Sequence, residues 1–144
     1  MKRVRQILIA EDNLADIELI KSAFDEINLF AEIIIVKDGQ ALLDFFENDN
    51  IEKLALVLLD LNLPKIDGMD ILKKFYTDKV LKKIPIVVFT SSNDYDKIIT
   101  CYEYGANACI KKPDDISEFS KTIRATTNFW LEVNVLPSFN AVTL

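Results

Sequence analysis

The sequence predicts an α/β fold of the doubly wound class, a five-stranded parallel sheet with helices on both faces, or (βα)5. Apolar runs of strand length alternate with amphipathic segments of helix length along most of the chain. The second, third and fourth runs are dense in Ile, Val and Leu without polar alternation, which is typical of strands covered on both faces. A length of 144 residues suits one domain with a substantial core.

The predicted strands are the five apolar runs. They span Gln6–Ala10, Glu32–Val36, Leu54–Leu59, Pro85–Phe89 and Asn107–Ile110. Right-handed crossovers between successive strands then give a parallel sheet with helices on both faces. We expect the flavodoxin-like strand order 2-1-3-4-5 for this sheet.

The predicted helices carry apolar residues at helical spacing, which we expect to face the sheet. These stripes are Ile17, Ile20, Phe24 and Ile27; Leu42, Phe45 and Phe46; Ile71, Leu72 and Phe75; Tyr95, Ile98, Ile99 and Tyr102; and Ile116, Phe119, Ile123 and Trp130. The fourth stripe is the most regular, and Gly105 supplies a C-cap beyond it. The last helix begins near Asp115, which stands three residues before Glu118, as in a capping box. Residues 1–131 form the predicted domain, and residues 132–144 form a tail without a clear period.

Charge and composition exclude several classes of function. Acidic residues outnumber basic ones 23 to 17, and no basic stripe occurs, which argues against nucleic-acid binding. The start of the chain is basic, but the apolar run after it ends at Ala10, too early for a signal peptide or membrane span. We therefore expect a cytoplasmic protein. The chain has no histidine, which excludes histidine catalysis, and Cys101 and Cys109 lack metal-site spacing.

Chemically active side chains follow four of the five predicted strands. Glu11 and Asp12 follow the first, Asp60 the third and Thr90 the fourth. Lys111, Lys112 and Pro113 follow the fifth. Each residue alone fits a bland structural role, such as a helix cap, a turn or a solvated charge. Because the carboxyl ends of parallel strands form the usual ligand-binding edge, the four groups together predict one small cleft.

The chemistry of such a cleft favours a divalent cation. Two carboxylates about 4 Å apart repel each other by about 4 kcal/mol at an effective dielectric constant near 20. A proton or a cation must relieve that repulsion. A small set of oxygen ligands suits Mg²⁺, which keeps several waters, with Mn²⁺ as an alternative. Phosphoryl transfer needs mainly positioning and charge stabilisation, and a carboxylate can be the nucleophile. Asp60 is the best candidate because it ends the most apolar strand.

At these positions the chain resembles the receiver domains of two-component response regulators, over residues 6 to about 131. The matching segments are Ile9-Ala10-Glu11-Asp12-Asn13, Leu59-Asp60-Leu61-Asn62-Leu63-Pro64, Asp67-Gly68-Met69-Asp70, Val88-Phe89-Thr90-Ser91-Ser92, Tyr104-Gly105-Ala106-Asn107 and Lys112-Pro113. Each segment alone is a weak signal, whereas their combination in this order is very specific. The resemblance implies a protein that signals through contacts with other proteins and catalyses only its own phosphorylation and dephosphorylation.

The resemblance also implies a role for each site residue. Asp60 would accept a phosphoryl group from a histidine kinase, and Asp12 and Asp60 would bind Mg²⁺. Asn62 would add its backbone carbonyl, and Glu11 would contact the metal through water. Thr90 would contact the phosphoryl group. Lys112 would pair with the phosphoryl group, because the family's lysine directly precedes a proline, here expected in a cis bond.

A narrower similarity links the chain to the stand-alone regulators of bacterial phytochrome kinases. It rests on Gly105-Ala106-Asn107, on Phe129-Trp130-Leu131 and on Val135-Leu136-Pro137. Such regulators commonly form homodimers through helix four, strand five and helix five. Three consecutive large apolar residues cannot all face one side of a helix, because each residue turns it by about 100°. The tail therefore either folds back over them or takes part in a dimer interface.

One position departs from the family pattern. Cys109, three residues before Lys112, stands where receivers usually carry the Tyr or Phe that moves inward together with the threonine. This places the usual threonine–aromatic switch in doubt, and we expect the thiol to fill space as a small apolar group.

Two other functions are compatible with a doubly wound fold of this kind. A degenerate receiver could act as a phosphorylation-independent scaffold, but the acidic, threonine and lysine positions are intact. A nucleotide- or flavin-binding domain needs a glycine-rich phosphate loop, and the chain has only Gly39, Gly68 and Gly105, without GxGxxG or GxxxxGK[ST].

Overall fold

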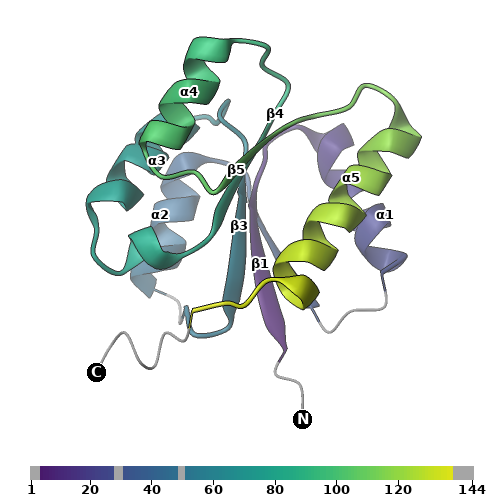
Figure 1. The fold of residues 1–144 in the computed structure, drawn as a ribbon, viewed down its shortest axis with the longest axis horizontal. Coiled ribbons are helices and arrows are strands. Elements are labelled where there is room, and N and C mark those ends of the chain that lie inside the picture. The colour runs from purple at the N-terminus through teal and green to yellow at the C-terminus, as the bar shows by residue number, and fades with distance from the viewer. Residues whose placement is uncertain (1–3, 28–30, 49–50, 138–144) are drawn as a thin grey trace.

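A computed structural model describes residues 4–27, 31–48 and 51–137 of the chain and contains the predicted five-stranded parallel sheet (Figure 1). Its strands are β1 (Arg5–Ala10), β2 (Ala31–Val36), β3 (Leu54–Leu59), β4 (Ile86–Thr90) and β5 (Ala108–Lys111). They lie in the order β2-β1-β3-β4-β5, and each neighbouring pair is parallel. The predicted order is confirmed, and the predicted boundaries agree within one residue at each end.

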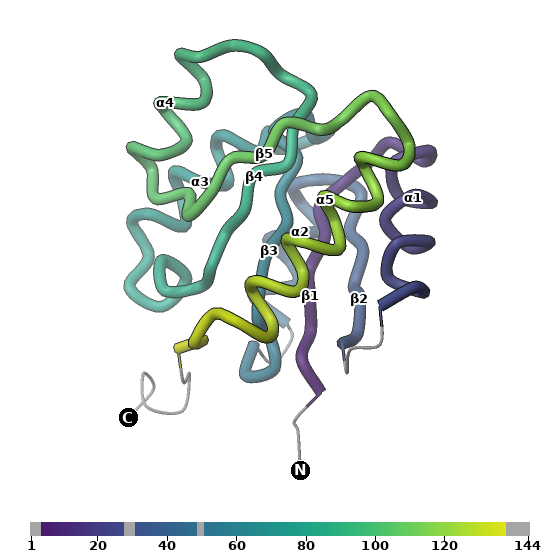
Figure 2. Tube along the Cα trace, turned by 45° about the vertical axis from the view of Figure 1, so that its right-hand side comes forward, coloured from purple at the N-terminus to yellow at the C-terminus, as the bar shows by residue number. Residues whose placement is uncertain are grey.

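Helices cover both faces of the sheet. They are α1 (Leu14–Asp25), α2 (Gly39–Asn48), α3 (Gly68–Thr77), α4 (Tyr95–Glu103) and α5 (Ile116–Asn128), with a short 3₁₀ helix, η1 (Leu81–Lys83), before β4. Helices α1 and α5 lie side by side on one face, and α2, α3 and α4 cover the other (Figures 1 and 2). In the described part of the chain, no helix is long and apolar enough to span a membrane.

Two apolar cores result, one on each face of the sheet. Alternate β3 residues serve both, since Val57 and Leu59 join one core while Leu56 and Leu58 join the other. Every residue of β3 is buried, as expected for the central strand of a sheet covered on both faces. The carboxyl end of β3, which Asp60 follows, is therefore fixed by packing on both faces of the sheet.

The apolar stripe on α4 does not face the core, contrary to the prediction. Tyr95, Ile99 and Tyr102 are 79%, 53% and 52% exposed, and Cys101 is the one fully buried residue of this helix. Helical spacing identifies the apolar side of a helix but not what covers it. The C-terminus of α4 is as predicted, because Gly105 follows it with a φ of +86°, a conformation that suits glycine.

Two residues of the other predicted stripes also lie outside the core. Ile27 falls beyond the end of α1, and Ile116, the first residue of α5, is 67% exposed. The helix itself begins as predicted, because the Asp115 side chain accepts a hydrogen bond from the Glu118 backbone N–H at 3.0 Å. Ile116 stands directly after the N-cap and is not among the residues that form or pack against either core.

The C-terminal part of the last helix changes its geometry. After Asn128 the helix continues as one π-helical turn, η2 (Phe129–Val133), which the periodicity did not predict. Trp130 and Leu131 pack against the core beside α5, whereas Phe129 and Val133 are 47% and 64% exposed. The wider turn places two of the three consecutive apolar residues on the sheet side. Of the predicted tail, residues 138–144 lie outside the described residues.

The peptide bond before Pro113 is trans, so the expected cis bond is wrong. The trans form is the one that most bonds preceding proline adopt, including those of folded proteins.

The loop after β3 is fixed against the start of α2. The Gly39 backbone N–H donates to the Pro64 carbonyl at 3.1 Å, and Lys65, with a φ of 65°, forms an ion pair with Asp38 at 3.5 Å. A methyl group on Gly39 would overlap the carbonyl of Ile66. Glycine is therefore required here by close backbone approach, and this contact positions the loop that carries Asp60.

Gly39→Ala should destabilise the protein by about 1–3 kcal/mol, as overpacking does, because the added methyl group displaces the loop backbone. In an unobstructed helix the same change stabilises by about 1 kcal/mol, so the sign of the effect is diagnostic. Urea denaturation measures it, with Gln40→Ala at the exposed neighbouring position as the control. A Gly39→Ala protein more stable than wild type would show that the loop is not held by this contact.

Candidate functional site

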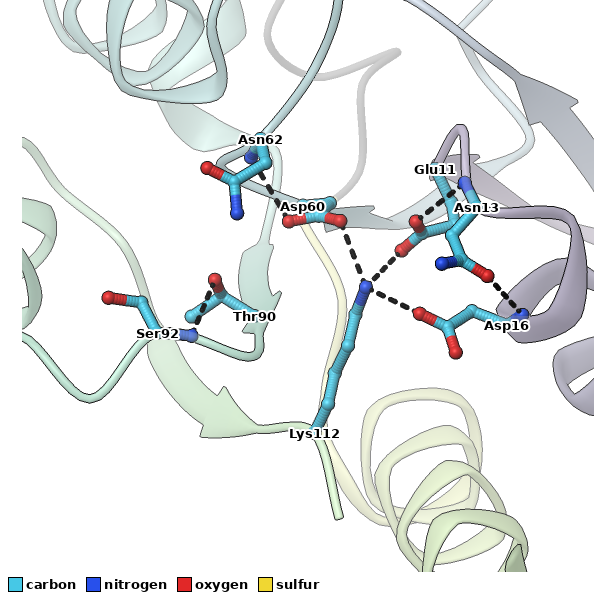
Figure 3. A network of polar contacts seen from close by, with 8 residues as sticks. All are labelled: Glu11, Asn13, Asp16, Asp60, Asn62, Thr90, Ser92 and Lys112. Atoms are coloured by element: carbon cyan, nitrogen blue, oxygen red, sulfur yellow. Dashed lines mark hydrogen bonds and ion pairs between the residues drawn. The ribbon is translucent and has the colours of Figure 1, made fainter. Parts of the chain in front are cut away.

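The predicted site residues gather at the carboxyl edge of the sheet. Glu11 follows β1, Asp60 follows β3, Thr90 ends β4 and Lys112 follows β5 (Figure 3). These four polar residues are all buried, with exposures of 1%, 5%, 2% and 8%. Burial of four ionisable or hydroxyl groups at one edge is unusual unless they interact with one another.

The Lys112 ammonium is the centre of the cleft. Its Nζ donates to Glu11 Oε2 at 2.6 Å, to Asp60 Oδ2 at 2.9 Å and to Asp16 Oδ2 at 2.9 Å (Figure 3). An ammonium has three N–H donors, so all three are used. Lys112 is directed there by β5, whose residues pair in register with β4, and its backbone N–H donates to the Thr90 carbonyl at 2.7 Å.

Asp16 is the residue that the sequence analysis missed. It lies in the first turn of α1, and its backbone N–H donates to the side chain of Asn13, the N-cap of that helix. The signal was present in the sequence. An acidic residue four positions after Asp12, in the first turn of a helix that starts at the carboxyl edge, lies near the same cleft.

Burial and charge shift the protonation of the cleft in opposite directions for its two kinds of group. Burial raises the pKa of Glu11 to about 7, the Asp60 charge adds to the rise, and the hydrogen bond from Lys112 opposes it. Burial disfavours the charged form of Lys112, but its bonds to Asp16, Glu11 and Asp60 outweigh that and hold its pKa above the usual value. The lysine is therefore charged at neutral pH, and one positive charge stands among several carboxylates.

A metal ion could be held by three carboxylates of the cleft, those of Glu11, Asp12 and Asp60. One oxygen each from Glu11, Asp12 and Asp60 lies within 4.8 Å of the others, and Asp12 is exposed to solvent while the other two are buried. Backbone N–H groups orient the buried pair, because Asn13 donates to Glu11 Oε1 and Asn62 donates to Asp60 Oδ1, both at 3.1 Å. The three oxygen donors leave the cluster open to solvent at Asp12. This arrangement matches the preference of Mg²⁺ or Mn²⁺ for few protein ligands and several waters.

Thr90 lies at the same edge but outside this network. Its Oγ1 accepts a long hydrogen bond, 3.3 Å, from the Ser92 backbone N–H (Figure 3). The hydroxyl proton is free of that bond and remains able to donate to an acceptor in the cleft.

Cys109 is half-buried on β5 and packs against the core on the α4 side. Its backbone N–H donates to the Tyr102 hydroxyl of α4 at 3.2 Å. Burial raises the pKa of Cys109, and it raises the pKa of the adjacent Cys101 to about 12. A thiol whose pKa is raised is less often ionised and is a weaker nucleophile, which supports the expectation that Cys109 fills space.

Comparison with known proteins gives a consistent result. A model of the response regulator receiver domain matches residues 7–124. Response regulator Rcp1 of Synechocystis sp. is 36% identical over 136 residues, 92% of this chain and 92% of that protein. The crystal structure of the phosphorylated cyanobacterial phytochrome response regulator RcpA matches at 34% identity with a TM-score of 0.88, over 94% of this chain and 100% of that one. The Mn²⁺-bound form of response regulator Rcp1 matches at 34% identity with a TM-score of 0.86, over 92% and 99%.

Lys112→Met should lower the free energy of unfolding in EDTA by about 3–5 kcal/mol, because it leaves buried carboxylates without their counter-charge. Asp60→Asn removes part of the repulsion and should leave stability equal or higher. Chemical denaturation compares the variants, and Lys111→Met, at the exposed neighbouring position, should stay within about 0.5 kcal/mol of wild type. Equal stability of Lys112→Met and Lys111→Met would contradict this account of the cleft.

Proposed function

The chain belongs to the response regulator receiver family, and from that premise we propose that it is a single-domain response regulator whose Asp60 accepts a phosphoryl group from a histidine kinase. The observation that carries the proposal is the Asp60 carboxylate, buried at the end of β3 and 2.9 Å from the Lys112 ammonium beside a candidate metal cluster. The protein would turn over no separate substrate. It would catalyse only the formation and hydrolysis of its own aspartyl phosphate.

The proposed reaction depends on Mg²⁺ or Mn²⁺ at Glu11, Asp12 and Asp60. A bound cation would neutralise the carboxylates and the incoming phosphoryl oxygens. Asp12 and Asp60 would bind the ion directly, Glu11 through water, and Asn62 through its backbone carbonyl. The chain's own groups would do the rest. Lys112 would pair with the phosphoryl group, and Thr90 would donate its hydroxyl to a phosphoryl oxygen.

The proposed partner is a histidine kinase of the bacterial phytochrome type. RcpA is a phytochrome response regulator by name, and the present chain matches it over its full length. A cytoplasmic location is part of the proposal, supported by the two cysteines, Cys101 and Cys109, which are free thiols although they are neighbours.

A scaffold that works without phosphorylation is the second candidate. It would use the same fold and the same exposed surfaces but not the cleft. The buried network of Lys112 with three carboxylates favours the phosphoacceptor, since a scaffold has no use for buried charges that are costly to desolvate. The glycine-poor strand ends give a nucleotide or flavin no phosphate-binding loop.

We further propose a homodimer through α4, β5 and α5. The outward stripe of α4 at Tyr95, Ile99 and Tyr102 supports it, as does half-exposed Phe129 after α5. Because β5 is the edge strand, α4 and α5 flank it on opposite sides (Figure 1). A symmetric contact would bury both sets of apolar residues against a second copy.

Asp60→Asn should abolish phosphorylation. Wild type treated with acetyl phosphate and Mg²⁺ is expected to gain the mass of one phosphate, and Asp60→Asn should gain none, because an amide is not a nucleophile under these conditions. Intact mass spectrometry measures both. Asp67→Asn, which changes an exposed acid of the same loop, should still be labelled. A stable single phosphate on Asp60→Asn would contradict the assignment of Asp60 as the phosphoacceptor.

Mg²⁺ should stabilise the folded protein, by about 2.7 kcal/mol when its concentration is 100 times the dissociation constant. Asp12→Ala should lose most of this gain, because Asp12 is the exposed member of the metal cluster. Thermal or urea unfolding with millimolar Mg²⁺ and with EDTA gives the difference. Asp25→Ala, an exposed acid at the end of α1, is the control and should keep the full gain.

Phe129→Asp should weaken self-association by at least about tenfold, since a charge in an apolar contact costs more than 1.4 kcal/mol. Sedimentation equilibrium over a wide concentration range, with and without beryllofluoride as a phosphoryl mimic, measures this. Leu14→Asp, at an apolar position that is 66% exposed on α1, should associate like wild type. A wild-type protein that is monomeric in both states would contradict the dimer.

A further inference from the structure

The Lys112 ammonium and a bound metal ion would share two carboxylates. The Lys112 ammonium is bonded to Glu11 Oε2 and Asp60 Oδ2, and the same two carboxylates belong to the candidate metal cluster. A divalent ion bound to them would stand next to the ammonium, and like charges repel strongly at such short distance in a partly buried cleft. A further negative charge on the lysine would offset this repulsion and let both cations share the cleft.

Asp16 is placed to supply that charge. Its Oδ2 is 2.9 Å from Lys112 Nζ, and its side chain is 21% exposed. Asp16 comes from α1 and approaches the ammonium from one side. Asp60 approaches it from the opposite side, where Asn62 also lies (Figure 3). Asp16 is not part of the metal cluster of Glu11, Asp12 and Asp60. The bond to Asp16 can therefore persist while a metal takes the oxygens of Glu11 and Asp60.

We propose that Asp16 is a positioning residue for metal binding and phosphoryl transfer, acting through Lys112. It holds the ammonium at the α1 side of the cleft, so that a divalent cation can bind Glu11, Asp12 and Asp60 without expelling the lysine. From that position Lys112 still reaches a phosphoryl group on Asp60. This inference rests on the proposed function and adds to it a residue that the receiver motifs do not include.

A purely structural role for Asp16 also has a clear physical basis, and the experiment must distinguish it from the proposed role in metal binding. An acidic side chain in the first turn of a helix is stabilised by the helix dipole, whatever lies across the cleft. Asp16→Asn suits the test, because it keeps the shape of the side chain and removes only its charge. The N-cap bond is retained, since it uses the backbone N–H of residue 16.

The experiment is a double-mutant cycle on Mg²⁺ affinity, measured by isothermal titration calorimetry with Mg²⁺ alone and no phosphoryl donor. The proteins are wild type, Asp16→Asn, Lys112→Met and the double variant, each checked for folding by circular dichroism. Glu18→Gln is the matched control, because it removes an equal charge from the exposed side of the same helix. Far from the cleft, that charge is screened by solvent.

We expect Asp16→Asn to weaken Mg²⁺ binding at least fivefold, and Glu18→Gln by less than twofold. In the Lys112→Met background, the same Asp16→Asn change should weaken binding by less than twofold, because there is no ammonium left to hold. That coupling between the two positions is the signature of a residue acting through another.

Three results would overturn the inference. Unchanged affinity in Asp16→Asn, with wild type binding Mg²⁺ normally, would refute it and leave the proposed function intact. An equal loss in both backgrounds would mean that Asp16 acts on the metal and not through the lysine. Wild type that neither binds Mg²⁺ nor becomes phosphorylated would instead refute the proposed function, and the inference with it.

Discussion

The electrostatic balance around Lys112 is the constraint on which the rest of the site depends. Four carboxylates, those of Glu11, Asp12, Asp16 and Asp60, converge from the end of β1, the start of α1 and the end of β3, and a single ammonium lies among them. The parallel sheet makes this convergence unavoidable, because it delivers the ends of β1, β3 and β5 to one edge. The excess of negative charge makes the cleft a good receptor for a cation.

The sequence predicted the fold well because its strongest patterns are those that define strands. Unbroken runs of branched apolar residues define the strands, and β3 is buried along its whole length. The exposed stripe of α4 shows the limit of that reasoning. Periodicity is a property of one helix, whereas exposure depends on its neighbours, and α4 lies beside the edge strand with little to cover it. The same limit explains Ile116, which is exposed at the first position of α5.

The site was predicted in part for a related reason. Residues that directly follow strands could be placed, since the sheet fixes where a strand ends, and Glu11, Asp60, Thr90 and Lys112 lie at that edge. Asp16 reaches the cleft from a helix, so its position depends on where that helix is capped and how it tilts. The π-helical turn after α5 is also a packing result: it brings Trp130 to the core, and no short sequence pattern encodes that demand.

The bond between Tyr102 and the β5 backbone has a consequence for the solubility of the folded chain. β5 is an outer strand, and the backbone amides on its free side are a template for adding a strand from another molecule. The Tyr102 hydroxyl occupies one of these donors, the Cys109 N–H, in the middle of a strand of only four residues. The half-exposed Tyr102 side chain, which comes from the neighbouring helix α4, thus covers part of the open edge of β5. This bond makes one backbone donor of the open edge unavailable to a strand from another molecule, beside the exposed apolar residues of α4.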